Sequence, residues 1–366
     1  MQHSIVYFPD YAHANPYQTL LYSGIDAIFS SQHGSIDDAC LKLQRQAWDN
    51  RVIFHLHWED AIYRHLPSAG DALAECQRFL DQLEAFLDGG GLFLWTVHNR
   101  APHDGRYLEV HRSLCEKLAT LADQVHLHSF AALEELELDR ALDRGKVTVI
   151  PHGNYRPLYP NPGRLERGSD VGGRRFLLFG RLGGYKGGQS LVQSFAALDS
   201  DDAWLTIAGK QIDPIDLAGL PPAVGARVTV DNRFLSESDL LQVFEEADFV
   251  VSPYRASLTS GTVLLAMSLA RPVIVPGLPT LAELVIDGDN GLVFAPDEPG
   301  ALHAALQRAE RMSAEVWRRT AGRAFATAKR YDWRVIGHQL SGMFYRLIAK
   351  PRVRHAPGEG PAIGPP

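Results

Sequence analysis

Cysteine is scarce in this sequence. Cys40, Cys76 and Cys115 are the only three among 366 residues, and they lie far apart without forming a CxxC pair. An odd number of widely spaced cysteines argues against a disulfide framework, and the spacing does not match that of a zinc cluster. We therefore expect a reducing, cytoplasmic compartment.

Long apolar runs and an excess of positive charge are also absent. No segment offers about 18 uncharged apolar residues, and no basic stretch precedes an apolar one at the start, so we expect neither a membrane span nor a signal peptide. Amphipathic patterns at 71–87 and 109–121 leave peripheral contact with the inner face of the cell membrane open, although packing on a sheet explains them as well. With 36 Lys and Arg against 43 Asp and Glu, the net charge is −7. This charge argues against nucleic acid as a partner.

The length and the apolar pattern indicate two α/β domains. A chain of 366 residues with 45% hydrophobic content exceeds the size at which one core keeps growing. Short apolar runs alternate with helical patterns, which predicts two parallel sheets flanked by helices. The expected strands lie at 4–8, 52–56, 92–97, 125–128 and 147–151, and then at 176–179, 204–208, 228–230, 249–252, 272–275 and 291–294.

These runs set the expected domain boundaries. We predict an N-terminal domain at 1–155 and a C-terminal domain at 156–332. A helix should follow at 333–350, and the Pro- and Gly-rich tail at 351–366 should be disordered. Ligands of open parallel sheets collect at the carboxyl ends of the strands, so the chemistry should lie in the loops that follow them.

A glycine-rich turn, FGRLGGYKGGQS, follows the first strand of the second domain at 179–190. Gly180 lets a ligand approach the backbone, the following helix offers free N–H groups, and Arg181 with Lys186 could neutralise two phosphates as exposed loop cations. A plain turn with two solvated cations is the alternative. The segment is neither a Walker A loop nor GxGxxG.

A second polar loop precedes the apolar helix of VVSPYRASLTSGTVLLAMSLARPVIVPG at 250–277. Ser260, Gly261 and Thr262 begin that helix, so their amides and hydroxyls could receive a phosphate or a sugar hydroxyl. An ordinary N-cap explains them equally.

Candidate acid–base groups follow strands of the first domain. In TVHNRAPHDGRY, His98 could bind a sugar hydroxyl or a phosphate, and Asp104 could accept a proton from an acceptor hydroxyl. Glu59 follows the strand at 52–56. His98 and His103 lack a metal-ligand spacing, so no metal site is expected.

Taken together, the segments resemble a known family. HLHWED, TVHN, PHGNY, FGRLGGYKG, VSPY, LLAMSLARPVIV, AELVIDGDNGLVF and YDWRVIG occur in the order and spacing of the GT-B glycosyltransferases of the group 1 type, a large retaining family. The resemblance implies two Rossmann-like doubly wound domains facing a cleft, of which the N-terminal one binds the acceptor and the C-terminal one the nucleotide sugar, with a C-terminal helix that could cross back. It also implies that Arg181 and Lys186 hold the donor diphosphate, that the Ser260 to Thr262 turn holds phosphate or sugar, and that Glu283 faces the donor.

One departure separates this chain from the retaining pattern. The two positions where those relatives carry glutamates hold Ser257 and Leu265 here. Together with NPYQTLLY, HLHW, SGT and TVHN followed by PHD, this resembles the xanthan-type β-mannosyltransferases of exopolysaccharide assembly. That narrower resemblance implies GDP-mannose as donor, a polyprenyl-diphosphate oligosaccharide as acceptor, and inversion at the anomeric carbon.

We therefore predict a metal-independent glycosyltransferase without a cofactor. Inversion needs a base on the acceptor side, for which Asp104 is the first choice, followed by His98 and Glu59. A transferase using a UDP-sugar, with either stereochemistry, is the alternative within the class. A sugar-nucleotide epimerase, a phosphorylase or a non-catalytic nucleotide-sugar-binding module are the alternatives outside it, because a fold does not fix a function.

Overall fold

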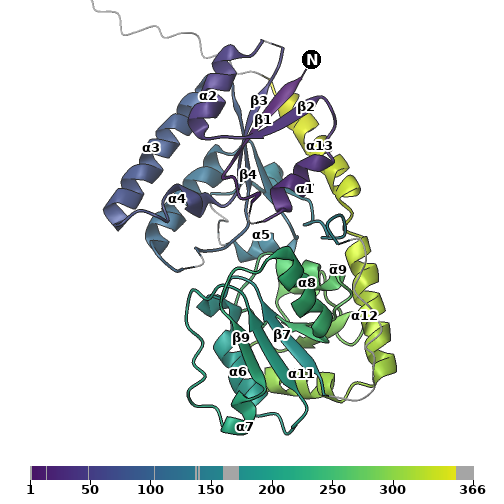
Figure 1. Cartoon of the computed structure of the whole chain (residues 1–366). Helices are drawn as coiled ribbons and strands as arrows, with labels where there is room; N and C mark the ends of the chain where they lie inside the picture. Colours follow the sequence, from purple (N-terminus) through teal and green to yellow (C-terminus); the bar gives the residue numbers. More distant parts are fainter. Residues whose placement is uncertain are drawn as a thin grey trace, which may run out of the picture. The chain divides into compact units, whose positions relative to one another are not determined.

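The computed structural model describes residues 2–351 except 14, 48, 103, 137, 139–140 and 160–172. It divides into two compact units (Figure 1). Unit 1 comprises Met1–Leu127, Leu136–Ile150 and the chain from Arg334 onward, and unit 2 comprises His128–Glu135 and Pro151–Trp333. Apart from Pro351, the tail that the sequence predicts to be disordered lies outside the described residues.

Unit 1 contains a parallel six-stranded sheet in the order β2-β1-β3-β4-β5-β6. Its strands are β1 His3–Phe8, β2 Phe29–His33, β3 Val52–Leu56, β4 Leu92–Thr96, β5 Gln124–Leu127 and β6 Val147–Val149. Its helices are α1 Tyr17–Ser23, α2 Ile36–Arg45, α3 Ala69–Asp88, α4 Leu108–Leu121 and α13 Trp333–Ile348, with short 3-10 helices η1 Glu59–Ile62 and η2 Arg144–Lys146. The helices cover both faces of the sheet (Figure 1).

The sequence of unit 1 explains which strands are central. Every residue of β3 and of β4 is buried, as continuous apolar runs require in a sheet that is covered on both faces. Strand β2, FSSQH, was missed by the sequence prediction because it is polar. It is one of the two edge strands, and three of its five residues are exposed. An edge strand that faces water needs no apolar run.

Unit 2 contains a second parallel six-stranded sheet, in the order β12-β11-β10-β7-β8-β9. Its strands are β7 Arg175–Phe179, β8 Trp204–Ala208, β9 Val228–Asp231, β10 Phe249–Val251, β11 Val273–Pro276 and β12 Gly291–Phe294. Its helices are α5 Ala131–Glu135, α6 Gly188–Ala196, α7 Pro222–Gly225, α8 Glu237–Glu246, α9 Gly261–Ser268, α10 Pro279–Ala282, α11 Ala301–Glu310 and α12 Ala314–Lys329, with the 3-10 helix η3 Gly184–Lys186. The predicted class, two doubly wound parallel sheets, is confirmed.

The strands of unit 2 face two apolar cores. Phe176 and Leu178 point into a core with α6 and α11, whereas Leu177 points into a core with α8 and α9, as the alternation of side chains along a strand requires. The strand order reverses between β7 and β10, which are neighbours in the sheet. Such a switch point opens a crevice at the carboxyl ends of the two strands. The glycine-rich turn follows β7 and the Ser260 loop follows β10.

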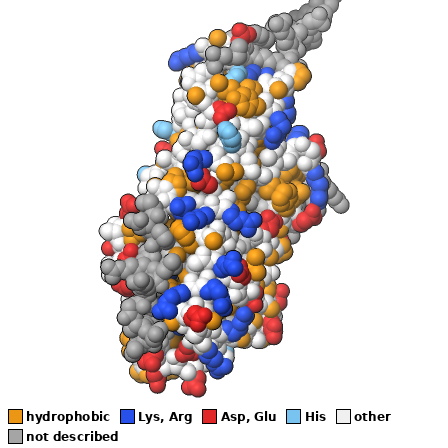
Figure 2. Space-filling model, turned by 90° about the vertical axis from the view of Figure 1, so that its right-hand side faces the viewer, with side chains coloured by type: hydrophobic (Ala, Val, Ile, Leu, Met, Phe, Trp, Pro, Cys, Tyr) orange, Lys and Arg blue, Asp and Glu red, His pale blue; other side chains and the backbone are white. Residues whose placement is uncertain are grey.

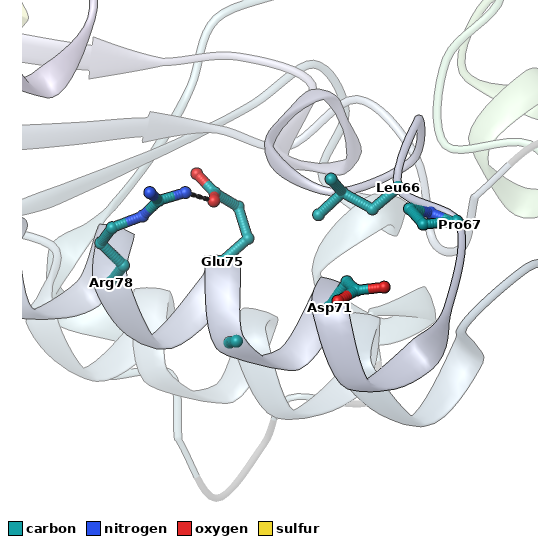
Figure 3. A pocket seen from close by; sticks show the side chains of 6 residues that line it. Leu66, Pro67, Asp71, Glu75 and Arg78 are labelled. Atoms are coloured by element: carbon teal, nitrogen blue, oxygen red, sulfur yellow. Dashed lines mark ion pairs between the residues drawn. The ribbon is translucent and has the colours of Figure 1, made fainter.

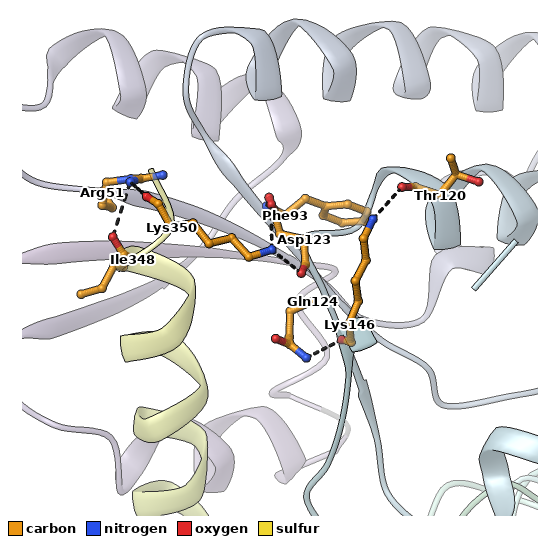
Figure 4. A network of polar contacts seen from close by, with 8 residues as sticks. All are labelled: Arg51, Phe93, Thr120, Asp123, Gln124, Lys146, Ile348 and Lys350. Atoms are coloured by element: carbon orange, nitrogen blue, oxygen red, sulfur yellow. Dashed lines mark hydrogen bonds and ion pairs between the residues drawn. The ribbon is translucent and has the colours of Figure 1, made fainter. Parts of the chain in front are cut away.

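Helix α13 closes unit 1 with the last described part of the chain. Phe344 is fully buried, and its ring lies 5.3 Å from that of Phe29; burying such a ring contributes about 1.5–3 kcal/mol. At the end of the helix, the Arg51 guanidinium donates to the Lys350 carbonyl at 2.9 Å, and the Lys350 ammonium donates to the Asp123 carbonyl at 2.7 Å (Figure 4). The first contact satisfies a carbonyl at the C-terminal end of the helix, and the second ties the end of the helix to the residue before β5.

Within the described ranges, none of the helices has the length and hydrophobicity needed to cross a bilayer.

Candidate active site

The glycine-rich turn of unit 2 begins directly after β7. Gly180 has a φ of +119°, a conformation that disfavours any residue with a side chain. A Cβ at this position would lie 3.3 Å from Lys186 Nζ and 3.5 Å from Thr262 Oγ1. The absence of a side chain at Gly180 therefore keeps room beside an ammonium group and a hydroxyl.

Lys186 lies in this turn but is only 7% exposed. The sequence prediction of an exposed loop cation is wrong for this residue, because η3 turns its side chain inward over the Tyr254 ring. Lys186 Nζ donates to Tyr254 Oη at 2.9 Å and to Thr262 Oγ1 at 3.4 Å. Burial alone would lower the pKa of Lys186, but the Tyr254 and Tyr185 hydroxyls outweigh it and the pKa is raised.

The ammonium group of Lys186 therefore keeps its charge with only hydroxyl partners. Among the residues that the structure describes, no carboxylate lies within ion-pair distance of Lys186 Nζ. Burying a charge without an opposite charge destabilises the folded state by up to several kcal/mol. An anion that enters beside Gly180 would supply the missing charge.

Ser260 connects this turn to the start of α9. Ser260 Oγ accepts the N–H of Val263 at 3.2 Å, which makes it the N-cap, and lies 2.9 Å from Tyr254 Oη. Gly261 has no room for a side chain, since a Cβ would lie 2.8 Å from Tyr155 Oη. The structure thus brings four predicted residues, Gly180, Lys186, Ser260 and Thr262, together in one cluster with Tyr254.

Arg181 and Glu283 lie outside that cluster of contacts. Arg181 is exposed, as expected, and no carboxylate in the described part of the chain pairs with it. Glu283 accepts two backbone N–H groups, from Phe130 at 3.2 Å and from Ala131 at 2.7 Å, and so caps the N-terminus of α5. This capping role was not predicted from the sequence.

A small pocket of about 90 Å³ lies between Glu283 and the Ser260 loop. Its lining includes His128, His152 and Thr280. Burial lowers the pKa of His152 to about 4, although a contact with the Gly153 carbonyl opposes the change. His152 is therefore a neutral ring at pH 7, suited to hydrogen bonding rather than to charge pairing.

The positions that differ from the retaining pattern also lie in unit 2. Leu265 is buried in the core of α9 and is 6% exposed. Ser257 Oγ donates to the Thr259 carbonyl at 2.9 Å. Neither position presents a carboxylate.

The candidate bases of unit 1 lie in different environments. Asp104 is exposed on the loop before α4, where Oδ1 accepts the N–H of Arg106 at 3.1 Å. His98 is 5% exposed at the end of β4, and its ring stacks on Trp58 with the centroids 4.1 Å apart. An accessible carboxylate suits proton transfer to a ligand, and a stacked imidazole suits a fixed contact.

Glu59 belongs to a buried polar cluster. Its Oε2 accepts the Trp95 Nε1–H at 3.1 Å, and its Oε1 lies 3.8 Å from His111 Nε2. Cys115 Sγ lies 3.5 Å from the same nitrogen, and Tyr63 Oη lies 2.8 Å from His111 Nδ1. Glu59, His111 and Cys115 could hold a metal, since their ligand atoms lie within 4.8 Å of one another. His111 and Cys115 are four apart on a helix, a spacing that the sequence analysis did not consider.

The protonation of Glu59 predicts how stability changes with pH. Burial raises the pKa of Glu59 from 4.5 to about 8, with Asp60 adding to the rise. Between these values the folded protein keeps a proton that the unfolded chain loses, so stability should fall with rising pH, by up to about 1.4 kcal/mol per unit. Glu59→Gln should remove this loss, as thermal unfolding midpoints measured from pH 5 to 9 would show.

The surface variant Glu116→Gln is the control for that experiment, because Glu116 is exposed on α4. The unfolding midpoint of Glu116→Gln should depend on pH in the same way as that of the wild type. If the unfolding midpoints of the wild type and of Glu59→Gln changed with pH in the same way, Glu59 would be ionised in the folded protein.

A separate hollow, of about 550 Å³, lies beside α3 in unit 1 (Figure 3). Asp71, Glu75 and Arg78 project from the helix, and Leu66 and Pro67 come from the loop before it. Glu75 and Arg78 pair with each other. None of the predicted site residues lines this hollow.

Tyr254 is the main residue of unit 2 that the sequence analysis missed. It connects Lys186 to Ser260. The signal was its place in VSPY directly after β10, at the carboxyl end of a strand.

The chain is similar in sequence to known glycosyltransferases. Residues 173–311 match a family model described as Glycosyl transferases group 1. The chain is 28% identical over 298 residues to the GDP-mannose:glycolipid 4-beta-D-mannosyltransferase of Xanthomonas campestris pv. campestris, an alignment that covers 81% of this chain and 78% of the relative.

Two solved structures share the fold. Sucrose-phosphate synthase from Thermosynechococcus elongatus superposes with a TM-score of 0.64 at 17% identity, covering 95% of this chain and 100% of that one. HepE from Anabaena, in complex with UDP and glucose, gives 0.64 at 17% identity, covering 94% and 100%.

Proposed function

We propose that this chain, a GT-B glycosyltransferase with a Glycosyl transferases group 1 domain at residues 173–311, moves mannose from GDP-mannose to a glycan or lipid-linked oligosaccharide with inversion. The acceptor oxygen attacks the anomeric carbon, the bond from that carbon to the diphosphate breaks, and GDP leaves. The proton of the acceptor hydroxyl passes to a base. An α-linked donor would then give a β-linked product, within a pathway of exopolysaccharide assembly.

The environment of Lys186 is the observation that carries the proposal. A buried ammonium with only hydroxyl partners, next to a glycine that leaves space, suits the diphosphate of a nucleotide sugar. Negative charge grows on that diphosphate as the bond to the sugar breaks, and a preorganised cation stabilises it. Arg181 and the first amides of α9 would add to the same effect.

Two other observations support mannose as the sugar and inversion as the stereochemical outcome. The Xanthomonas relative is named for GDP-mannose, a glycolipid and a β-linkage. Ser257 and Leu265 leave the donor side without the two acids of the retaining relatives. The HepE structure contains UDP and glucose, so a UDP-sugar is the rival donor to test.

Thermal shift and transfer assays test the proposal together. GDP and GDP-mannose should raise the unfolding midpoint more than UDP and UDP-glucose, because a ligand bound only to the folded state stabilises it. GDP-mannose with a lipid-linked oligosaccharide should give a product whose anomeric NMR signal is that of a β-linkage. An α-linkage would contradict inversion, and binding without transfer to any acceptor would favour a non-catalytic module. Release of free nucleoside diphosphate only with acceptor would exclude an epimerase or a phosphorylase.

A lipid-linked acceptor would bring the protein to a membrane surface. Exposed cations on α12 and just after it suit anionic headgroups, each worth about 1 kcal/mol near the surface. They are Arg318, Arg319, Arg323, Lys329 and Arg330. Figure 2, drawn from the side of α12, shows Lys and Arg side chains at many places on that face. Sedimentation with anionic but not with neutral vesicles would support this contact.

Activity should survive chelation of divalent metals. Protein cations already supply positive charge at the proposed diphosphate site, so the donor needs no bridging ion. Initial rates with and without EDTA should agree closely. Loss of activity with EDTA and its recovery with Mg²⁺ or Mn²⁺ would show that the reaction depends on a metal.

A further inference from the structure

Three side chains of different chemistry meet in the interior of unit 1. They are Glu59 from η1, which follows β3, and His111 and Cys115 from α4. All three are buried, with exposed fractions of 2%, 4% and 7%. A carboxylate oxygen, an imidazole nitrogen and the thiol sulfur lie within 4.8 Å of one another. The cluster therefore presents three potential metal ligands at one point.

Helix α4 sets the positions of His111 and Cys115. Residues four apart lie on the same face of a helix, and this face is turned inward, since Leu114 and Leu118 are also buried. His111 Nε2 lies 3.5 Å from Cys115 Sγ and 3.8 Å from Glu59 Oε1. Ligand atoms bound tetrahedrally to one zinc ion lie about 3.3–3.6 Å apart. Small rotations of the side chains would therefore bring all three ligands to one ion.

Neighbouring groups hold two of the three ligands in orientation. Tyr63 Oη lies 2.8 Å from His111 Nδ1, so Nε2 is the nitrogen that faces the thiol and the carboxylate. The backbone of Arg100 forms a further hydrogen bond with the ring. Trp95 Nε1 donates to Glu59 Oε2 at 3.1 Å, and Oε1 is the oxygen on the imidazole side. Metal-binding histidines and carboxylates usually have such outer hydrogen bonds.

A divalent cation would balance the charges of the cluster. In the part of the chain that the structure describes, the ion-pair partner of Glu59 is His111, and no Lys or Arg side chain takes that place. Carboxylate and thiolate bind a metal as anions, so binding releases the protons that Glu59 and Cys115 carry without it. Two negative charges and a neutral imidazole then face two positive charges. The buried group is neutral overall, which avoids the cost of an uncompensated interior charge.

We propose that Glu59, His111 and Cys115 bind a zinc ion in unit 1. A thiolate and an imidazole favour Zn²⁺ over Mg²⁺ and Ca²⁺, which prefer oxygen ligands. Three protein ligands leave the fourth position of the ion to a small ligand such as water. The ion links η1 to α4 and takes no part in sugar transfer, so its presence does not depend on the proposed function.

The depth of the site determines how the ion affects other measurements. A buried ion exchanges slowly, so initial rates should still agree with and without EDTA. The pH dependence predicted for Glu59 applies to the metal-free protein, because a bound ion takes the place of the proton. Protein produced in metal-depleted medium is the sample for that measurement.

Cobalt is the probe for the thiolate, since Co²⁺ occupies zinc sites and a thiolate ligand gives it a strong charge-transfer absorption in the near ultraviolet. The full chain is produced in medium with zinc or with cobalt, and its metal content is measured after gel filtration. We expect about one ion per chain and the absorption band in the cobalt protein. The zinc protein should unfold at a higher temperature than the metal-free protein, because the ion binds the folded state.

Substitutions assign the ligands, because the chain has only three cysteines. Cys115→Ser and His111→Gln should lose the ion. Cys40→Ser, on α2 and outside the cluster, is the matched control and should keep the ion and the band. Cys76→Ser should keep both as well, which assigns the thiolate to Cys115 even where Cys115→Ser does not fold. Tyr63→Phe should weaken binding about 10- to 100-fold.

Several results would overturn the proposal. Wild-type protein that holds neither zinc nor cobalt would show that the three side chains form only a hydrogen-bonded cluster. Cobalt without the charge-transfer band would exclude Cys115 as a ligand. An ion that remains in both Cys115→Ser and His111→Gln, or that is lost in Cys40→Ser or Cys76→Ser, would place the metal elsewhere.

Discussion

Asp104→Asn should lower kcat by about 10²–10⁴-fold, the usual contribution of a general base. The amide keeps the shape of the carboxylate and can still accept the Arg106 N–H, so the loop should keep its conformation. Donor binding should barely change, because the proposed diphosphate contacts lie in unit 2. Single-turnover rates with saturating GDP-mannose, together with a thermal shift titration of GDP, measure the two effects separately.

Glu109→Gln is the matched control, because it neutralises an exposed carboxylate in the first turn of α4, close in sequence to Asp104. It should keep full activity. If Asp104→Asn stayed active while His98→Gln or Glu59→Gln lost activity, inversion could stand but the base would be one of those two residues. The thermal midpoint of Glu59→Gln must then be compared as well, because Glu59 lies in the interior.

Lys186→Met should lower kcat/KM for the donor by about 10- to 150-fold, the equivalent of one charge-assisted contact. Methionine keeps an apolar stem of similar length over the Tyr254 ring. Because the ammonium has no carboxylate partner, its removal should leave the stability of the unliganded protein unchanged or raise it. The stabilisation that GDP gives to the wild type should be largely lost.

Two exposed cations of unit 2 complete that experiment. Arg181→Ala should weaken donor use over a similar range, whereas Lys210→Ala, an exposed cation after β8, should have no effect. Normal kcat/KM in both Lys186→Met and Arg181→Ala would show that the diphosphate binds elsewhere.

The sequence predicted the two sheets because apolar runs in parallel strands are visible without any structure. It could not predict that residues 128–135 belong to unit 2, where Phe130 and Ala131 donate their backbone N–H groups to the side chain of Glu283, which is distant in sequence. The inward turn of Lys186 was missed for a similar reason. The glycines around Lys186 indicated an exposed loop. The residue that covers its side chain, Tyr254, follows a different strand, β10.

The buried hydrogen bonds that connect His57, Tyr22, His55, Thr96 and His126 show the same limit. His55 and His57 are visible in the sequence as polar residues in and after an apolar strand. Their connection depends on the strand order, because Thr96 lies opposite His126 only when β4 and β5 are neighbours in the observed register. Propensity and periodicity do not contain that register.

The chain passes between the two units more than once, and this limits how unit 2 could be exchanged between relatives to change the proposed donor specificity. An exchange with one junction near residue 151 would carry α5 over from the wrong parent, and the carboxylate of Glu283 would meet foreign N–H groups. A chimaera that keeps native contacts needs a cassette from 151 to 333 together with the separate insert 128–135. The rest of α13, from Arg334 onward, must come from the parent of unit 1, since Phe344 and Lys350 complete that unit. Chimaeras with fewer junctions should be poorly packed, regardless of which parent supplies the proposed donor site.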